Sequence, residues 1–232
     1  FDDTLERLLE SSKCPESLEK LPVAISGMAG AMKGWRDAGY VPTPATLEAV
    51  AHGGVAFSSK RGREVRIFGG AKDSASGDVM RGEEVQIIGC SVSKGIVVLP
   101  GTHTKWVEIG EGGAIQSLTT FMTGEVFGLL HHHSLLSQTT STSTHTEKEA
   151  FMEGVRRGAT PSAGFLGAIF ETRSRVLAAT LSAGESARSF LSGVCLGVEM
   201  HAATHTSPTS FRLIGSLSQF HRYDLAAKAL KL

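Results

Sequence analysis

The sequence predicts an α/β protein with mixed sheets, and three observations support this class. Short runs rich in β-branched residues end at glycines, and helical segments lie between them in the first half of the chain. The second half is mainly helical before one further strand and a final helix. Glycine accounts for 27 of the 232 residues, which predicts many tight turns and close backbone approaches.

The composition excludes several function classes. With 23 Lys and Arg against 23 Asp and Glu, the formal net charge is +0, so nothing draws the whole chain to nucleic acid or to an anionic membrane. No apolar run approaches the roughly 18 residues of a membrane-spanning helix, and the acidic first residues do not resemble a signal peptide. The cysteines Cys14, Cys90 and Cys195 are scattered and predict reduced thiols in the cytoplasm.

Apolar spacing and glycine breaks locate the elements of the first half of the chain. The expected elements are a helix at 4–13, strands at 22–26 and 65–68, loops and short strands over 41–63, and a helix that opens at 78–84 and stops at Gly89. The first strand runs into Gly27-Met28-Ala29-Gly30 and then Trp35. This glycine pair either brings backbone close to a small ligand or is an ordinary tight strand exit.

The clearest β signal is a meander of three strands separated by glycine-containing turns. The strands are expected at 96–99, 105–109 and 115–121. Beyond them the sequence predicts helices at 124–136, 147–158, 164–173, 185–203 and 225–232, a Ser/Thr-rich loop at 137–146, and a strand at 211–214.

The turn Pro100-Gly101-Thr102-His103-Thr104-Lys105 is the first candidate site. It presents backbone N–H groups, two threonine hydroxyls and a lysine at one hairpin tip, which is what a polyphosphate requires. The alternative is an ordinary hairpin in which glycine and threonine serve the turn geometry and His103 caps it.

The segment Arg81-Gly82-Glu83-Glu84 is the second candidate site. A carboxylate that follows glycine at a helix start can reach a substrate hydroxyl and accept its proton. Arg81 can hold an anionic group of the same substrate with its forked guanidinium. The alternative is structural, because acidic residues in the first turn of a helix are stabilised by the helix dipole.

Two further motifs carry less information. Gly215-Ser216 follows a strand and would let a nucleotide base approach the backbone. His131-His132-His133 does not predict a metal site, because consecutive residues on a helix point about 100° apart and cannot converge on one ion.

Taken together and in this order, the motifs resemble those of one family. The residues that carry the resemblance are 27–30 with Gly34-Trp35, 78–84 with Gln86 and Gly89, 99–106, 122–125 with 133–136, and more weakly 190–193, 197–199 and 213–216. They are similar to the motifs of the 2-dehydro-3-deoxygalactonokinases, which belong to the actin-like sugar kinase superfamily. The similarity covers most of the chain.

The resemblance implies an actin-like ATPase fold of the sugar kinase and ribonuclease H type, with two α/β domains around a cleft. Residues 1–95 would be a partial N-terminal domain for the sugar acid, and residues 96–232 a partial C-terminal domain for the nucleotide. The implied reaction is the ATP- and Mg²⁺-dependent phosphorylation of the terminal hydroxyl of 2-dehydro-3-deoxy-D-galactonate in sugar-acid breakdown. The implied partners are the sugar acid and ATP, without nucleic acid or membrane, and a homodimer is left open.

The resemblance also implies residue roles. Glu83 would be the catalytic base, by position and not by identity, with Asp78 and Glu84 as alternatives, and Lys105 would act on the transferring phosphate. The implied substrate-binding residues are Gly27, Met28, Gly30, Trp35 and Arg81. The implied nucleotide-binding residues are Gly101, Thr102, His103, Thr104, Gly215 and Ser216. No residue is assigned to a metal.

One departure separates this sequence from the family pattern. Family members begin with an Asp-x-Gly-Thr type motif for Mg²⁺ and the first phosphate contact, but none occurs near Phe1, and the chain stops soon after the adenosine-contacting turn. We therefore expect either a fragment of a longer chain, which the absent initial Met favours, or a relative that has lost catalytic parts. The latter would be a non-catalytic structural or partner-binding subunit. A third alternative is a sugar-acid sensor that binds no nucleotide.

Overall fold

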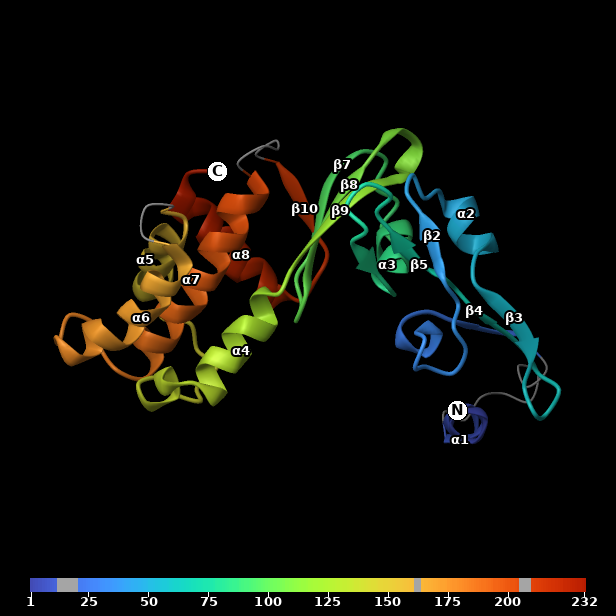
Figure 1. Cartoon of the computed structure of the whole chain (residues 1–232), viewed down its shortest axis with the longest axis horizontal. Helices are drawn as coiled ribbons and strands as arrows, with labels where there is room; N and C mark the ends of the chain where they lie inside the picture. The colour runs from blue at the N-terminus through green and yellow to red at the C-terminus, as the bar shows by residue number, and fades with distance from the viewer. Residues whose placement is uncertain (12–20, 161–163, 205–209) are drawn as a thin grey trace. The chain divides into compact units, whose positions relative to one another are not determined.

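The computed structural model describes residues 1–11, 21–160, 164–204 and 210–232 and divides the chain into two compact units (Figure 1). The first unit comprises Phe1–Gly95 and Val107–Thr119, and the second comprises Ile96–Trp106 and Thr120–Leu232. The division passes through three strands, which are β7 (Gly95–Leu99), β8 (Thr104–Ile109) and β9 (Ile115–Phe121). Neither unit is therefore a single continuous stretch of chain.

Two three-stranded mixed sheets build the first unit, as the fold class predicts. In the order β1-β4-β3, β4 (Glu64–Ile67) runs parallel to β1 (Val23–Ile25) and antiparallel to β3 (Val55–Ser58). In the order β2-β5-β6, β5 (Gly70–Lys72) runs parallel to β2 (Tyr40–Pro42) and antiparallel to β6 (Val79–Met80). The helical elements of this unit are α1 (Asp2–Ser11), η2 (Met28–Gly30), α2 (Leu47–His52), α3 (Glu83–Gly89) and η3 (Glu111–Gly113).

The core of the first unit forms on β4. Val65 and Ile67 alternate along this strand, so both project to the same face, and both are fully buried. Trp35 and Phe57 pack against them, with their rings edge to face at a centroid distance of 5.0 Å. This small cluster fixes the strands from which the glycine segment 27–30 emerges.

Two expectations for the first unit are wrong. The helix expected to open at 78–84 and to stop at Gly89 opens only at Glu83, because Val79–Met80 pair as β6 and Gly82, with a positive φ of +108°, precedes the helix. The region 41–63 holds a helix, α2, that we expected as loops and short strands. Thr46 caps α2 by accepting a hydrogen bond from the backbone N–H of Ala49 at 3.1 Å.

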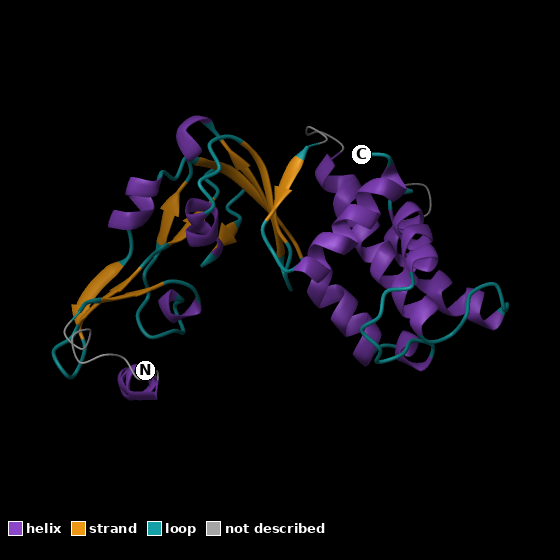
Figure 2. Cartoon of the chain, turned by 180° about the vertical axis from the view of Figure 1, so that it is seen from behind, coloured by secondary structure: helices purple, strands orange, loops and turns teal. Residues whose placement is uncertain are grey.

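The second unit carries most of the helices, as Figure 2 shows. Its strand β10 (Phe211–Leu213) runs parallel to β7 in a four-stranded sheet of order β10-β7-β8-β9, which confirms the predicted meander. The helical elements are α4 (Thr123–His133), η4 (Leu135–Gln138), α5 (Lys148–Gly158), α6 (Gly164–Leu177), α7 (Glu185–Thr204) and α8 (Leu217–Leu230).

Helices α5 and α7 meet backbone to backbone. A Cβ on Gly154 would lie 2.1 Å from the carbonyl oxygen of Phe190, and a Cβ on Gly193 would lie 2.1 Å from that of Phe151. One turn further along, Gly158 and Gly197 face the carbonyls of Val194 and Val155 in the same way. Because both sets of partners advance together along the chain, the two helices run parallel.

Helix α8 begins earlier than the sequence indicates. We expected its start at residue 225, but it starts at Leu217 because Ser216 and Gln219 form a reciprocal capping box. The Ser216 hydroxyl accepts from the Gln219 backbone N–H, and the Gln219 side chain accepts from the Ser216 backbone N–H at 2.7 Å. Leu225 and the residues after it form only the second half of this helix.

Two of the three cysteines, Cys90 and Cys195, lie in the described part of the chain. Cys90 is exposed, Cys195 is buried, and both are free thiols, whereas Cys14 lies outside the described residues. In the part of the chain that the structure describes, no helix has both the length and the apolar character needed to cross a bilayer.

The close contact of α5 and α7 predicts that one added methyl group greatly lowers the free energy of unfolding. Gly193→Ala should lower the free energy of unfolding by about 3 kcal/mol, because a Cβ there meets a backbone carbonyl that cannot rotate away. Gly167→Ala on α6 is the matched control, since a Cβ at that helical position meets nothing within 4 Å. It should be neutral or stabilising by about 0.5–1 kcal/mol in the same urea titration. Equal effects of the two substitutions would contradict the packing described.

Candidate functional site

The candidate site at Arg81–Glu84 forms where two glycine turns of the first unit meet. Gly27 and Gly82 both have positive φ, at +92° and +108°, and a Cβ on Gly82 would lie 3.3 Å from the Cα of Gly27. Gly27 precedes η2 and Gly82 precedes α3. Segments more than fifty residues apart in sequence are thus brought together, as the sequence hypothesis of a shared substrate site requires.

Arg81 is held at this junction with part of its guanidinium unused. Its Nη2 donates to the carbonyl oxygen of Gly39 at 3.0 Å, and the guanidinium lies 4.3 Å from the ring centroid of Tyr40. A Cβ on Gly30 would approach Nη1 to 2.9 Å, so glycine leaves the room that this side chain occupies. Among the described residues, the buried Nε and Nη1 of Arg81 have no hydrogen-bond partner. They are donors suited to an anion.

The three carboxylates that the sequence left open differ in environment. Glu83 is half-buried, and its Oε2 accepts from the backbone N–H of Arg81 at 2.9 Å. Glu84 is fully buried, both its oxygens accept from the backbone N–H of Gly82, and burial raises the pKa of its carboxyl. Asp78 accepts from the backbone N–H of Val79 at 2.7 Å. Glu83 is therefore the carboxylate that stands beside Arg81 at the start of α3.

Two other predicted substrate residues, Met28 and Trp35, differ in their exposure and contacts. Met28 is 73% exposed on η2. Trp35 stacks on Phe1 at a centroid distance of 6.0 Å and packs edge to face on Phe57, inside the hydrophobic cluster of β4. The ring of Trp35 thus serves the core of the unit, and its substrate role stays a prediction.

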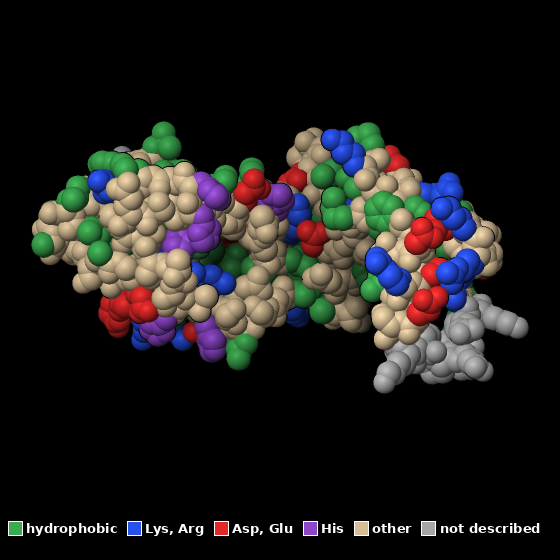
Figure 3. Space-filling model, turned by 90° about the horizontal axis from the view of Figure 1, so that it is seen from below, with side chains coloured by type: hydrophobic (Ala, Val, Ile, Leu, Met, Phe, Trp, Pro, Cys, Tyr) green, Lys and Arg blue, Asp and Glu red, His purple; other side chains and the backbone are tan. Residues whose placement is uncertain are grey.

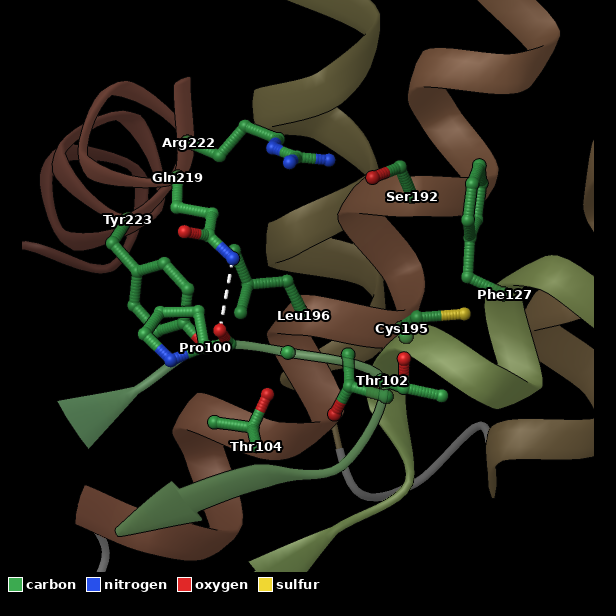
Figure 4. A pocket seen from close by; sticks show the side chains of 13 residues that line it. Pro100, Thr102, Thr104, Phe127, Ser192, Cys195, Leu196, Gln219, Arg222 and Tyr223 are labelled. Carbon is green, nitrogen blue, oxygen red and sulfur yellow. Dashed lines mark hydrogen bonds between the residues drawn. The ribbon is translucent and has the colours of Figure 1, made fainter. Parts of the chain in front are cut away.

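The candidate site at the turn after β7 opens on a cavity of about 420 Å³ within the second unit (Figure 4). Its walls come from the turn after β7, the start of α4, and the helices α7 and α8. The lining residues are Pro100, Gly101, Thr102, Thr104, Thr123, Gly124, Phe127, Ser192, Cys195, Leu196, Gln219, Arg222 and Tyr223. Three of the predicted nucleotide residues, Gly101, Thr102 and Thr104, are therefore brought together in one cavity.

The turn and the start of α4 are built against each other. The carbonyl oxygen of Thr102 accepts from the backbone N–H of Glu125 at 3.0 Å, and a Cβ on Gly124 would lie 2.4 Å from the carbonyl oxygen of Gly101. Helix α4 starts at Thr123 without a side-chain cap from Met122. A helix start carries partial positive charge and N–H groups free to donate, so this wall of the cavity suits a phosphate group.

His103 and Lys105 do not line this cavity. His103 pairs with the carboxylate of Glu125 on the exposed side of the turn. We expected Lys105 at the hairpin tip, but it lies inside β8, where its buried Nζ donates to the Thr120 hydroxyl at 2.8 Å. Successive residues of a strand face opposite sides, so Thr104 and Trp106 face the cavity side and Lys105 faces away from it.

Gly215 and Ser216 do not line the cavity themselves, but they contact Gln219, which does. Ser216 caps α8, and a Cβ on Gly215 would lie 2.6 Å from Gln219 Oε1. Gln219 does line the cavity, and its Nε2 donates to the carbonyl oxygen of Pro100 at 2.8 Å (Figure 4). The adenosine-contacting role of Gly215 and Ser216 therefore stays a prediction, and their observed role is to start the helix that carries Gln219.

The sequence analysis missed a buried carboxylate beneath the cavity. Glu199 on α7 is 1% exposed, and it accepts hydrogen bonds from Trp106 Nε1 at 2.9 Å and from the hydroxyls of Tyr223 and Thr123. The Thr104 hydroxyl also bonds to it. Burial raises the pKa of Glu199, because it outweighs these hydrogen bonds, and burial also raises the pKa of Tyr223. Glu199 falls in the weaker match at 197–199, but its role is not apparent from the sequence because its four donors come from three separate elements, β8, α4 and α8.

Histidines gather at the surface of the second unit (Figure 3). His131 is buried on α4, its Nδ1 lies 2.9 Å from the Thr140 hydroxyl, and burial lowers the pKa of its imidazole. Across the ranges that the structure describes, no three His, Cys, Asp or Glu side chains are grouped so that they could hold a metal ion.

Comparison with known proteins decides the family. Residues 1–232 match the family model described as 2-keto-3-deoxy-galactonokinase. The chain belongs to this family. The resemblance seen in the motifs is thereby confirmed, and this galactonokinase-family chain is related to sugar-acid kinases.

Two curated relatives and one solved structure are similar over most of the chain. A Rhizobium meliloti (strain 1021) protein named as a probable 2-dehydro-3-deoxygalactonokinase is 34% identical, and the Escherichia coli (strain K12) 2-dehydro-3-deoxygalactonokinase is 33% identical. Each alignment covers 91% of this chain and 72% of the relative. A crystal structure from Sinorhizobium meliloti, assigned as a 2-dehydro-3-deoxygalactonokinase, matches with a TM-score of 0.89 at 32% identity. It covers all of this chain and 77% of that one, and it confirms the expected sugar kinase fold.

The environment of Glu199 predicts a pH-dependent stability difference. The folded protein raises the pKa of this carboxyl above the ordinary value of 4.5, so its contribution to stability is full below that value and is lost as the pH rises. The free energy of unfolding of the wild type, relative to that of Glu199→Gln, should therefore fall between pH 4 and pH 8. Urea titrations at several pH values measure it.

A second variant separates titration from hydrogen bonding. Glu199→Leu leaves the donors of Trp106 and Tyr223 buried without an acceptor, so it should be about 3 kcal/mol less stable than Glu199→Gln at every pH, because neither variant titrates at this position. A constant difference between the wild type and Glu199→Gln across the pH range would show that the carboxyl does not titrate differently in the folded state.

Proposed function

We propose that this chain transfers the γ-phosphoryl group of ATP to the terminal hydroxyl of 2-dehydro-3-deoxy-D-galactonate and forms the 6-phosphate. Family membership supports a sugar-acid kinase. The observation that carries the proposal is the junction at Gly27 and Gly82, where Arg81, with unused donors, stands beside the half-buried carboxylate of Glu83. A cation for an acidic substrate and a base for its hydroxyl are the two groups that such a reaction needs.

On the acceptor side, the proposed roles follow from the contacts. The Nε and Nη1 atoms of Arg81 would donate to the carboxylate of the sugar acid, and Tyr40 and Gly39 hold the guanidinium in place. Glu83 would accept the proton of the terminal hydroxyl as that oxygen bonds to phosphorus and the bond from phosphorus to the ADP oxygen breaks. The backbone N–H of Arg81 orients Glu83 for this step.

On the donor side, the cavity of the second unit fits a nucleotide. The backbone of Gly101 and Thr102 and the start of α4 would face the phosphates, while Gln219 and Arg222 of α8 line another wall. The hydroxyls of Thr104 and Thr123 stand at the floor, held by Glu199. Lys105 has no place in this assignment, because it faces the other side of the sheet.

Mg²⁺ is proposed to arrive with the nucleotide. It usually binds through one or two carboxylates together with substrate phosphates and water, and when bound it neutralises the phosphate charge. The described residues form no three-ligand cluster of their own, so we assign no residue to it. Since ATP is the phosphoryl donor and the two described cysteines are free, we place the reaction in the cytoplasm.

The role of Glu83 gives a kinetic prediction. In an assay that couples ADP release to a recorded signal, the full-length protein with its complete N-terminus should turn over ATP when 2-dehydro-3-deoxygalactonate is added. Glu83→Gln should lower kcat by about 10²- to 10³-fold, because the amide still accepts from the Arg81 N–H but cannot take a proton. Glu48→Gln, at an exposed position of α2, is the control and should leave kcat unchanged.

Two outcomes of this assay would count against the proposal. Substrate-independent ATP turnover, or none at all, would remove the kinase function. An undiminished kcat in Glu83→Gln would show that Glu83 is not the catalytic base. Parallel assays with the gluconate epimer measure the ratio of kcat/KM for the two sugar acids. The two substrates differ in the hydrogen bonding of one hydroxyl.

The role of Arg81 gives a binding prediction. Arg81→Gln should raise KM for the sugar acid at least about tenfold and leave KM for ATP within about twofold, because charge-assisted hydrogen bonds to the carboxylate are lost. Arg81→Lys should recover only part of the loss, since lysine lacks the planar fork. The control is Arg36→Gln, an exposed arginine of the same unit that lies over the Phe57 ring. Unchanged KM for the sugar acid in Arg81→Gln would exclude this role.

A further inference from the structure

Outside the predicted site, one arginine lines the cavity of the second unit and a second contacts a residue of its wall. Arg222 of α8 lines the cavity, and Figure 4 shows its side chain extending across the opening toward Ser192 of α7. Arg188 lies one helical turn before Ser192 on α7, and residues four apart share a helix face. Its guanidinium is 5.4 Å from the ring centroid of Phe127, another residue of the cavity wall.

The charge of this pair is not neutralised by a close carboxylate. Within the described ranges of the chain, neither Arg188 nor Arg222 forms an ion pair, and the buried Nε of Arg188 has no hydrogen-bond partner. Burial lowers the pKa of Arg188, the positive charge of Arg222 lowers it further, and Glu185 offsets part of the effect. Two cations kept close at a cavity wall are each stabilised when an anion lies between them.

We propose that Arg188 and Arg222, with the Ser192 hydroxyl, form an anion-binding site of the cavity that holds a phosphate group of the bound nucleotide. This proposal rests on the proposed function, because it assumes that the nucleotide occupies this cavity. It adds a cationic wall of side chains on α7 and α8 to the backbone wall at Gly101, Thr102 and the start of α4. Arginine suits this task because its planar fork donates two parallel hydrogen bonds to phosphate oxygens.

The test compares ligands with and without phosphate. Isothermal titration of the full chain with ADP and with adenosine is carried out for the wild type, Arg222→Gln, Arg188→Gln and the control Arg156→Gln. Arg156 is exposed on α5 and lies outside the cavity. The two cavity variants should weaken ADP at least tenfold and change adenosine less than twofold, whereas the control should change neither.

Three results would overturn the proposal. An equal loss for ADP and adenosine would place the arginines against the base or ribose. Unchanged ADP affinity in both variants would remove them from the site. Inorganic phosphate that binds the wild type but not the variants, while ADP binding is unaffected, would make this a site for free phosphate.

The outcomes for the wild type separate failure of this inference from failure of the proposed function. If the wild type binds no ADP, both this inference and the nucleotide side of the proposed function fail. If it binds ADP and transfers phosphate but the variants behave as the wild type, only the inference fails. Thermal denaturation monitors folding, and Arg222→Lys should regain part of the ADP affinity if Arg222 acts through its charge.

Discussion

The buried carboxylate of Glu199 is the interaction on which the cavity of the second unit depends. It collects hydrogen bonds from Trp106 and Thr104 of β8, Thr123 of α4 and Tyr223 of α8. Three of these donors also line the cavity. A single acceptor therefore sets the spacing between a strand, the start of one helix and the face of another. This hydrogen-bond network stabilises the fold only when every donor is paired with Glu199, because an unpaired polar group in the protein interior lowers the stability.

The acceptor side is organised by backbone geometry instead. Gly27 and Gly82 adopt conformations that favour glycine, so two chain segments approach closely enough to share one small site. Arg81 fills the space beside Gly30 and keeps two donors without a protein partner. Among the described residues these buried donors have no acceptor, which carries a desolvation cost.

Much of this arrangement could be predicted from the sequence, because it depends on local signals. The meander at 96–121, the glycine turn at 101 and the segment at 81–83 are each marked by glycine, proline or charge within a few residues. The sequence predicts Lys105 in the strand at 105–109 with its charge at the hairpin tip, but the packing of the sheet, which no local signal specifies, turns the side chain toward Thr120. Glu199 and the glycines of α5 and α7 act through partners far away in sequence, so their roles depend on tertiary packing that the local sequence does not specify.

The parallel pair α5 and α7 has a consequence for how this protein can vary over generations. A side chain that grows too large can usually be accommodated by a smaller one opposite. At Gly154 and Gly193 the opposing atoms are peptide carbonyls, which are the same whatever residue carries them. No second substitution can restore the fit, so these positions lack the compensating routes by which ordinary cores drift while keeping their shape.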